Sequence, residues 1–307
     1  MTQKLGLALG GGAALGWAHI GIIQVLTEND IRPDIVTGTS IGSIVGACYV
    51  AGKMEVLENV ARGMNWHRMI RLADIQIGKN GFLAGEPVVA LLREHLGDSR
   101  IEDFDRPFAA VAADLVSGDQ VIFDKGDVVD ALRASISIPG VFTPVRSGQR
   151  LLVDGGLLNT VPVSTCRDVG ADLVIGVNIV GDFEGQAAAA GLLRGPDETS
   201  TQGRVGETAG ARVAFTNLGQ SVARFFRKEA KEPGFLGVAL TSGALILREI
   251  ARGHAATCPA DVYIEPKVGH ITQIEFDKAD ELIALGREAI KVKIPQIKAL
   301  LARADQS

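Results

Sequence analysis

Aromatic residues are scarce in this chain, at 5% of its 307 residues, so aliphatic side chains supply most of its 47% apolar content. Small and branched aliphatic residues suit a parallel sheet that helices cover closely. The longest apolar stretches, such as residues 235–247, are short and interrupted by Gly and Ser, so we expect no membrane-spanning helix. The net charge of −5 gives no general attraction to nucleic acids or anionic lipid surfaces.

Cysteine is also rare, and Cys48, Cys166 and Cys258 show neither the spacing of a metal site nor a disulfide framework. We expect all three to be buried small apolar residues in a reducing compartment. The N-terminus runs into a predicted strand without the features of a secretory signal. We therefore expect a cytoplasmic protein. It should need no metal and no cofactor, because no acidic cluster or histidine pair indicates a metal site.

Strands and helices alternate along the chain. Strands are predicted at residues 4–9, 34–37, 108–114, 119–123, 150–153, 172–178 and 260–264, and helices at 16–29, 41–52, 54–64, 85–96, 127–135, 161–169 and, as one helix or a pair, 272–302. This alternation predicts an α/β fold with a mainly parallel central sheet. The strands 108–114 and 119–123 resemble a hairpin with a Gly-containing turn, which would make the sheet mixed.

Residues 38–42 read Gly-Thr-Ser-Ile-Gly and lie between a predicted strand and a predicted helix. The pattern G-x-S-x-G places a serine on a sharp strand-to-helix turn, where the flanking glycines avoid a Cβ clash. Ser40 is therefore a candidate nucleophile. A plain packing turn is the alternative, which this motif alone leaves open.

Gly10, Gly11 and Gly12 follow the first predicted strand and precede a helix. Consecutive glycines at a helix N-terminus expose backbone N–H groups that favour negative charge. An ester-cleaving serine needs such donors for the oxyanion of its tetrahedral intermediate. A dinucleotide-binding loop is the alternative, although G-x-G-x-x-G would require glycine at Leu15.

Asp154 follows the predicted strand 150–153 and precedes two glycines. It is a candidate to orient or deprotonate Ser40, although an ordinary aspartate–glycine turn would read the same. The three motifs each follow a strand directly. Because sites gather beyond the carboxyl ends of parallel strands, one such sheet would bring all three motifs together.

These motifs, in this order, resemble those of the patatin-like phospholipase family. The similarity covers most of residues 4–180 and, more loosely, the C-terminal helices. The resemblance implies a three-layer patatin-like fold, with helices on both faces of the sheet, and a lipid acyl hydrolase. The implied roles are an oxyanion hole at Gly10, Gly11 and Gly12, a nucleophile at Ser40 and a base at Asp154. Residues 134–139 also resemble the family's A-S-x-x-x-P stretch.

Two residues depart from the family's pattern, which commonly reads G-G-G-x-R-G. Leu15 replaces the arginine, which removes a fixed positive charge and several donors beside the loop. Ala13 stands where a further glycine is frequent, and it fits if its backbone is already helical. The backbone donors remain, but substrate choice and catalytic rate are left open.

We assign the base to Asp154 rather than to a histidine, although serine hydrolases usually use histidine. None of the five histidines lies in a strand-end motif with a carboxylate partner. His19 is the nearest rival, one turn inside the helix after the glycine loop, where we expect a structural role. A dry pocket would raise the pKa of Asp154 above its usual value of about 3.9 and strengthen it as a base.

We expect residues 1–307 to form a single domain with a catalytic core at 4–180 and C-terminal helices with one strand at 209–307. Residues 181–208 predict a mobile loop, either a plain insertion or a lid over an acyl pocket. Apolar residues in 213–226 recur with helical spacing. With Phe235 and Leu236, they indicate either a helix packed on the core or a surface that contacts lipid or another subunit.

The sequence thus predicts a serine acyl-ester hydrolase that cleaves fatty-acyl esters or (lyso)phospholipids through an acyl-enzyme. One alternative is a regulatory or scaffold protein with little turnover, which Leu15 favours. Another is a nucleotide-binding α/β protein that uses the glycine loop. The expected partner is a lipid substrate and not nucleic acid, while peripheral membrane contact and a homo-oligomer stay open.

Overall fold

The computed structural model describes residues 3–65, 83–182 and 235–304, together with Arg68 and Leu72. Almost all of the predicted loop or lid at 181–208 lies outside the described residues. The apolar positions 213–226 and the side chains of Phe235 and Leu236 also lie outside them. Those predictions therefore stay predictions.

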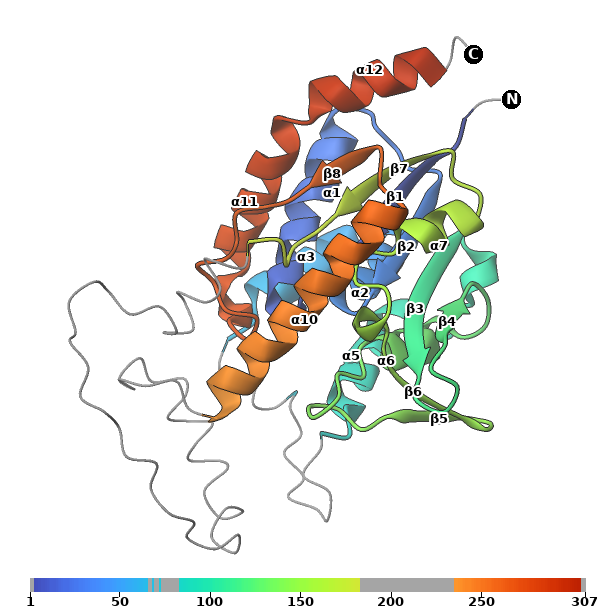
Figure 1. The fold of residues 1–307 in the computed structure, drawn as a ribbon, viewed down its shortest axis with the longest axis vertical. Coiled ribbons are helices and arrows are strands. Elements are labelled where there is room, and N and C mark those ends of the chain that lie inside the picture. The colour runs from blue at the N-terminus through green and yellow to red at the C-terminus, as the bar shows by residue number, and fades with distance from the viewer. Residues whose placement is uncertain (1–2, 66–67, 69–71, 73–82, 183–234, 305–307) are drawn as a thin grey trace, which may run out of the picture.

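An eight-stranded sheet forms the centre of the molecule (Figure 1), in the order β5-β6-β3-β2-β1-β7-β8, with β4 paired to β3. The strands are β1 (Leu5–Leu9), β2 (Ile35–Thr39), β3 (Phe108–Asp114), β4 (Gln120–Phe123), β5 (Val145–Ser147), β6 (Arg150–Asp154), β7 (Leu173–Val177) and β8 (Val262–Ile264). The strands β3, β2, β1, β7 and β8 run parallel. The prediction of a mainly parallel sheet is therefore confirmed.

The antiparallel part of the sheet lies beyond β2. The hairpin of β3 and β4 was predicted, and it is present. The strand β6 is antiparallel to β3, and β5 is antiparallel to β6. Neither β5 nor the reversed direction of β6 was predicted, and the second of these changes how the site is assembled.

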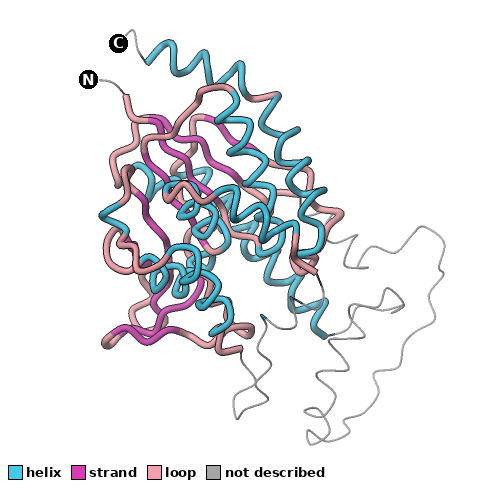
Figure 2. The backbone as a smooth tube through the Cα atoms, turned by 180° about the vertical axis from the view of Figure 1, so that it is seen from behind, coloured by secondary structure: helices cyan, strands magenta, loops and turns pink. Residues whose placement is uncertain are grey.

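Helices cover both faces of the sheet (Figures 1 and 2). They are α1 (Ala18–Glu28), α2 (Ile41–Val50), α3 (Met54–Arg62), α5 (Glu86–Leu96), α6 (Val128–Ser135), α7 (Val163–Asp168), α10 (Phe235–Thr257), α11 (Ala279–Lys291) and α12 (Ile294–Ala304), with 3₁₀ turns η1 (Ala13–Trp17), η2 (Ile101–Asp103), η3 (Gly155–Leu157) and η4 (Phe276–Lys278). Alternate residues of a strand point to opposite faces. Leu7 and Leu9 join the core with α1, α2 and α11, whereas Ala8 packs with Cys166 of α7 and Ala251 of α10. The predicted three-layer α/β architecture is present.

The cysteines follow the prediction only in part. Cys48 and Cys166 are buried and free, and burial raises the pKa of each thiol to about 12. Cys258 is also free, but it is half-buried rather than buried. It lies just after the end of α10 and packs against the apolar cluster that includes Cys166.

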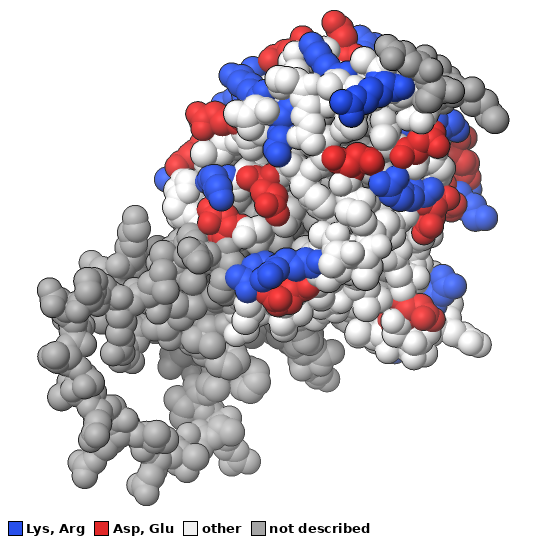
Figure 3. Space-filling view, turned by 45° about the horizontal axis from the view of Figure 1, so that its top comes forward, with Lys and Arg blue, Asp and Glu red and all other residues white. Residues whose placement is uncertain are grey.

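Charges of both signs are interspersed over the face of the described residues that Figure 3 shows. No helix within the described ranges combines the length and apolar character needed to cross a bilayer. In the same ranges, no group of three His, Cys, Asp or Glu side chains is arranged to hold a metal ion.

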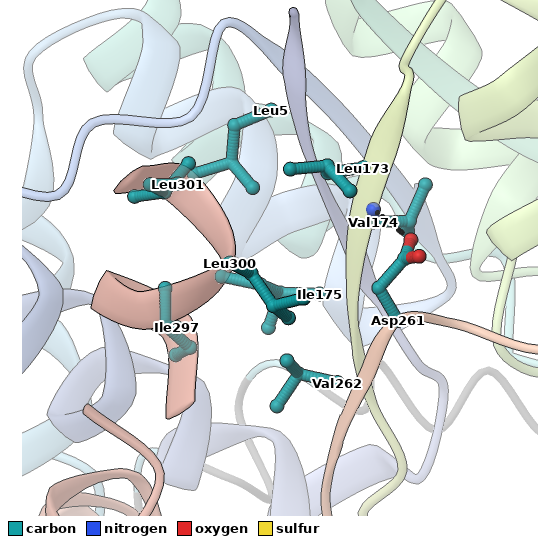
Figure 4. Close-up of a pocket in the computed structure, with 9 residues that line it drawn as sticks. All are labelled: Leu5, Leu173, Val174, Ile175, Asp261, Val262, Ile297, Leu300 and Leu301. Carbon is teal, nitrogen blue, oxygen red and sulfur yellow. Dashed lines mark hydrogen bonds between the residues drawn. The ribbon is translucent and has the colours of Figure 1, made fainter. Parts of the chain in front are cut away.

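A small hollow lies between α12 and the strands β1, β7 and β8 (Figure 4). Its lining is Leu5, Leu173, Val174, Ile175, Asp261, Val262, Ile297, Leu300 and Leu301. The one charged group there, Asp261, already accepts hydrogen bonds from Arg167 and the Val174 N–H. Because Leu5 and Leu173 begin their strands, the hollow lies at the end of the sheet away from Ser40.

Helix α11 crosses α1 in very close contact. A Cβ atom on Gly286 would overlap the carbonyl oxygen of Ala18, and one on Gly21 would overlap that of Ile283. Glycine costs helix stability, so its presence in both helices is explained by the close approach that it permits. The crossing matters for the site because α1 continues directly from the glycine-rich loop and η1.

We predict that Gly286→Ala destabilises the protein by about 1–3 kcal/mol, because the added methyl group must force the two helices apart. Gly253→Ala is the matched control, since this glycine of α10 is exposed and nothing lies within 4 Å of an added Cβ atom. The control should stabilise the protein by about 0.5–1 kcal/mol through helix propensity. Chemical denaturation measures the free energy of unfolding of each variant, and an equal change in the two variants would contradict the close crossing.

Candidate active site

Ser40 occupies a sharp turn between β2 and α2. Its backbone has φ 55° and ψ −127°, in the positive-φ region that residues other than glycine rarely adopt. Such a conformation persists only where the surroundings hold it, and it is common at functional sites. Only 5% of the residue's surface is exposed. The strand-to-helix turn predicted from G-x-S-x-G is therefore present.

Close backbone packing requires the two glycines of this motif. A Cβ atom on Gly38 would overlap the carbonyl of Gly42, and one on Gly42 would overlap the carbonyl oxygen of Leu9. The turn is thus folded tightly on itself and lies against the end of β1. A larger residue at either position would push Ser40 away from the glycine-rich loop that follows β1.

Asp154 reaches Ser40 by a different route from the one predicted. We expected the carboxyl ends of parallel strands to bring the motifs together, but β6 runs antiparallel to β3. Since β4 takes the other edge of β3, β2 and β6 lie end to end along one edge. Thr39 pairs with Val111, and Asp154 pairs with the next residue, Ala112. The serine and the carboxylate therefore meet where two opposing strands end.

The carboxyl group of Asp154 is buried beside Ser40. Burial raises its pKa from 3.8 to about 6, while the nearby Ser40 side chain and the hydrogen bond from the Gly156 N–H lower it. The Gly156 nitrogen lies 2.7 Å from Oδ1. A carboxylate with this pKa is still ionised near neutral pH, and it is a stronger base than an exposed aspartate. The Ser40 side chain thus lies close enough to the Asp154 carboxyl group to lower its pKa, in a nearly dry environment.

The glycine-rich loop requires a correction to the predicted oxyanion hole. The Gly10 N–H donates to the Val177 carbonyl, and the Gly11 N–H donates to the Thr160 carbonyl, both at 3.0 Å. Each backbone N–H carries one hydrogen, so these two donors are already used. Of the three glycines proposed for the hole, Gly10 and Gly11 shape the loop but do not offer a free N–H.

The next two amides are free within the described part of the chain. Neither the Gly12 N–H nor the Ala13 N–H has an acceptor among the described residues. Gly11 brings the loop against the nucleophile, because a Cβ atom on Gly11 would lie 3.3 Å from the Cβ of Ser40. Unpaired amides near a serine hydroxyl are the kind of donor that an oxyanion requires.

Ala13 does not meet the condition under which an alanine would fit this position easily, because its backbone is not helical. Its φ is 50°, in the left-handed region. This region favours glycine and costs other residues roughly 1–2 kcal/mol. Ala13 is therefore strained at the start of η1. The preceding residue, Gly12, also has positive φ, at 155°.

Leu15 belongs to the core of the protein. It is fully buried and packs in the main apolar cluster. Its neighbour Gly16 lies so close to Ile41 that an added Cβ atom would overlap that side chain. The loop is therefore held by apolar packing at the position where the family pattern has an arginine.

His19 contacts the glycine loop and not the serine. Its Nε2 donates to the carbonyl oxygen of Gly10 at 2.8 Å, because that oxygen can only accept. Its Nδ1 is buried without a hydrogen-bond partner among the residues that the structure describes. Burial lowers the pKa of His19 to about 4, against the opposing effect of the Gly10 hydrogen bond. The imidazole is therefore neutral near pH 7, with its donor already used.

Ser135 is a polar neighbour of Ser40 to which the sequence alone assigned no role. It is fully buried, and its Oγ accepts a hydrogen bond from the Ser40 N–H at 2.9 Å. The resemblance of residues 134–139 to a family motif included this serine. The only feature of the sequence that could have indicated this contact is a polar residue at the end of the otherwise apolar face of α6.

Comparisons with known proteins show which proteins the chain is similar to. The chain is 38% identical over 189 residues to an uncharacterised NTE family protein of Mycobacterium tuberculosis, a match that covers 62% of this chain and 52% of the relative. A second such protein of the same species is 33% identical over 295 residues, which cover 95% of this chain and 46% of the relative. Lysophospholipase NTE1 of Pyricularia oryzae is 28% identical over 291 residues, covering 92% of this chain and 18% of the enzyme.

The chain thus spans about half the length of the first curated relatives that it matches. The family model for patatin-like phospholipase matches residues 7–167, slightly more than half of the chain. The matched residues include the glycine-rich loop, the Ser40 turn and Asp154. The chain therefore belongs to the patatin-like phospholipase family.

Proposed function

We propose that this protein is a serine acyl-ester hydrolase that cleaves fatty-acyl esters or (lyso)phospholipids with a dyad of Ser40 and Asp154. One observation carries the proposal. The buried carboxyl group of Asp154 lies beside the Ser40 turn, because Thr39 and Asp154 pair with successive residues of β3, and burial raises its pKa to about 6. A buried base next to a hydroxyl on a strained turn is the arrangement that activates a serine nucleophile.

In the proposed acylation step, Ser40 Oγ attacks the carbonyl carbon of the ester while Asp154 accepts its proton. Transfer during the attack avoids a free alkoxide, which a carboxylate could not generate efficiently. The negative charge moves to the former carbonyl oxygen. The free N–H groups of Gly12 and Ala13 are our candidates to stabilise it.

The intermediate then collapses. The bond to the alcohol breaks, the leaving oxygen takes the proton from Asp154, and the acyl group stays on Ser40. Asp154 next accepts a proton from a water molecule that attacks the acyl-enzyme, and Ser40 recovers that proton as the fatty acid leaves. The same carboxyl group thus serves as base and acid in both halves of the reaction.

The choice of lipid substrates rests on family membership and on the relative named lysophospholipase NTE1. We propose a monoacyl lipid as the first substrate to test, with peripheral contact to a lipid surface. The scaffold alternative keeps one argument, because Leu15 leaves no arginine at that position of the loop.

The first test is covalent labelling with a fluorophosphonate probe. We expect labelling of the wild-type chain at Ser40 and none in Ser40→Ala, because only an activated serine reacts with the probe. Peptide mass spectrometry locates the adduct. A wild-type chain that stays unlabelled at high probe excess would favour the scaffold, and an adduct at another serine would overturn the assignment of Ser40.

The second test is the pH dependence of ester hydrolysis. A protonated carboxyl cannot accept the Ser40 proton, so kcat/KM should rise with pH and level off above an inflection at about 6. Asp154→Asn should lower turnover by about 10²–10⁴-fold. An inflection at the pH of an exposed carboxylate, or near wild-type turnover in Asp154→Asn, would contradict the dyad.

The same shift predicts a change in stability. The folded chain holds the Asp154 proton more tightly than the unfolded chain, so protonation of Asp154 stabilises the fold. This stabilisation is fully present below about pH 4 and is lost as pH rises through about 6. An asparagine side chain at this position would carry no such charge. Asp154→Asn should therefore be more stable than wild type at about pH 8, by up to about 3 kcal/mol, and the difference should vanish toward pH 4. Thermal denaturation at the two pH values measures it.

The third test concerns His19 as a rival base. His19→Ala removes the partner of the Gly10 carbonyl and leaves a cavity, so it should destabilise the protein by about 2–4 kcal/mol. The remaining activity should keep its inflection at about pH 6, because that inflection belongs to Asp154. A folded His19→Ala chain that has lost turnover and no longer labels would mean that the histidine is the base.

A further inference from the structure

The hydroxyl of Ser135 links the nucleophile turn to the sheet. Its Oγ accepts a hydrogen bond from the Ser40 N–H at 2.9 Å and donates one to the Val111 carbonyl at 2.6 Å. Ser135 is fully buried, and it is the last residue of α6. One hydroxyl therefore links the Ser40 turn to β3, the strand with which both β2 and β6 pair.

The Ser40 N–H needs this acceptor because of the turn's geometry. At Ser40 the chain has left the β2 ladder and has positive φ, and the helical hydrogen bonds of α2 begin only beyond it. A buried N–H without an acceptor costs free energy. The Ser135 hydroxyl thus favours the strained backbone conformation that directs the Ser40 side chain toward Asp154.

The same short segment also holds the carboxylate partner. The carbonyl of Ser137 accepts a hydrogen bond from the Asp154 N–H at 3.0 Å. Ser137 is itself fixed, because its hydroxyl accepts from Arg133 at 2.6 Å, and the Arg133 guanidinium also donates to the Thr143 carbonyl. Residues 135 and 137, on either side of Ile136, therefore each hold one member of the pair.

We infer that Ser135 is a positioning residue, whose hydroxyl sets the Ser40 backbone so that the nucleophile stays aligned with Asp154. The inference rests on the proposed function. Ser135 does not touch a reacting atom and exchanges no proton with substrate. It acts through the Ser40 N–H, while the nearby Ser137 carbonyl holds the Asp154 backbone.

Ser43 provides a matched control. It is also a fully buried serine bonded to the Ser40 backbone, since its Oγ donates to the Ser40 carbonyl at 2.6 Å. That carbonyl accepts a second hydrogen bond, from the Ser43 N–H at 2.9 Å. Removal of the Ser43 hydroxyl therefore leaves the Ser40 carbonyl paired, whereas removal of the Ser135 hydroxyl leaves the Ser40 N–H without its acceptor.

The experiment compares Ser135→Ala and Ser43→Ala by ester hydrolysis and by the rate of fluorophosphonate labelling. Small displacements of a reacting group cost up to about 100-fold in rate. We expect Ser135→Ala to lower kcat and the labelling rate by about 10- to 100-fold with KM unchanged. Its pH inflection should stay at about 6, as in the wild type, because Asp154 remains the base. Ser43→Ala should change each rate by less than about threefold, and Ser135→Thr, which keeps the hydroxyl, should restore most of the loss.

The outcomes separate this inference from the proposed function. If the wild-type chain neither labels nor hydrolyses esters, the proposed function fails. If the wild type is active and folded Ser135→Ala labels at the same rate, or both alanine variants lose activity equally, the positioning role is overturned. Should Ser135→Ala not fold, Ser135→Cys decides in the same assays. Its thiol keeps the shape but is a weak acceptor, so it should label more slowly than wild type.

Discussion

The burial of one carboxyl group beside one hydroxyl is the interaction on which the site depends. Water would solvate an exposed aspartate and leave it a weak base, whereas burial raises the pKa of Asp154 to about 6. The same burial disfavours the charged form that the proposed reaction needs. The hydrogen bond from the Gly156 N–H offsets part of this cost, and the nearby Ser40 hydroxyl also lowers the pKa. Burial therefore makes Asp154 a stronger base but lowers the stability of the fold at neutral pH, and the hydrogen bond from the Gly156 backbone limits that loss.

That backbone is packed so closely that most of the motif glycines have a steric explanation. Gly42 lies against the Leu9 carbonyl, and a Cβ atom on Gly155 would overlap the Val111 carbonyl. These contacts bring three chain segments together at the point where β2 and β6 end on β3. The glycines thus do more than permit turns. They let main chains approach closely enough for a serine and an aspartate 114 positions apart in the sequence to lie side by side.

Local patterns in the sequence were sufficient for most of the elements and for the α/β class, and they led to the proposed pairing of Ser40 with Asp154. They failed where long-range pairing decides. Strand β6 carries no local mark of its direction, so the meeting of Ser40 and Asp154 was attributed to parallel strand ends rather than to two opposed strands. Local patterns also could not predict that the Gly10 and Gly11 amides donate to the Val177 and Thr160 carbonyls, because those acceptors lie far along the chain. The positive φ of Ala13 was missed because alanine is a poor indicator of that conformation.

The C-terminal part of the described chain also bears on the glycine loop, although it lies beyond the family match at residues 7–167. The Ala14 N–H donates to the Gln273 carbonyl, and the Trp17 indole donates to the Phe276 carbonyl. Gly286 of α11 packs on Ala18 at the start of α1. The turn η1 is therefore held between the sheet and residues from the far end of the chain. The amides of Gly12 and Ala13, which have no acceptor among the described residues, lead directly into that turn. Their direction therefore depends both on the half of the chain that carries the motifs and on the C-terminal residues that contact η1.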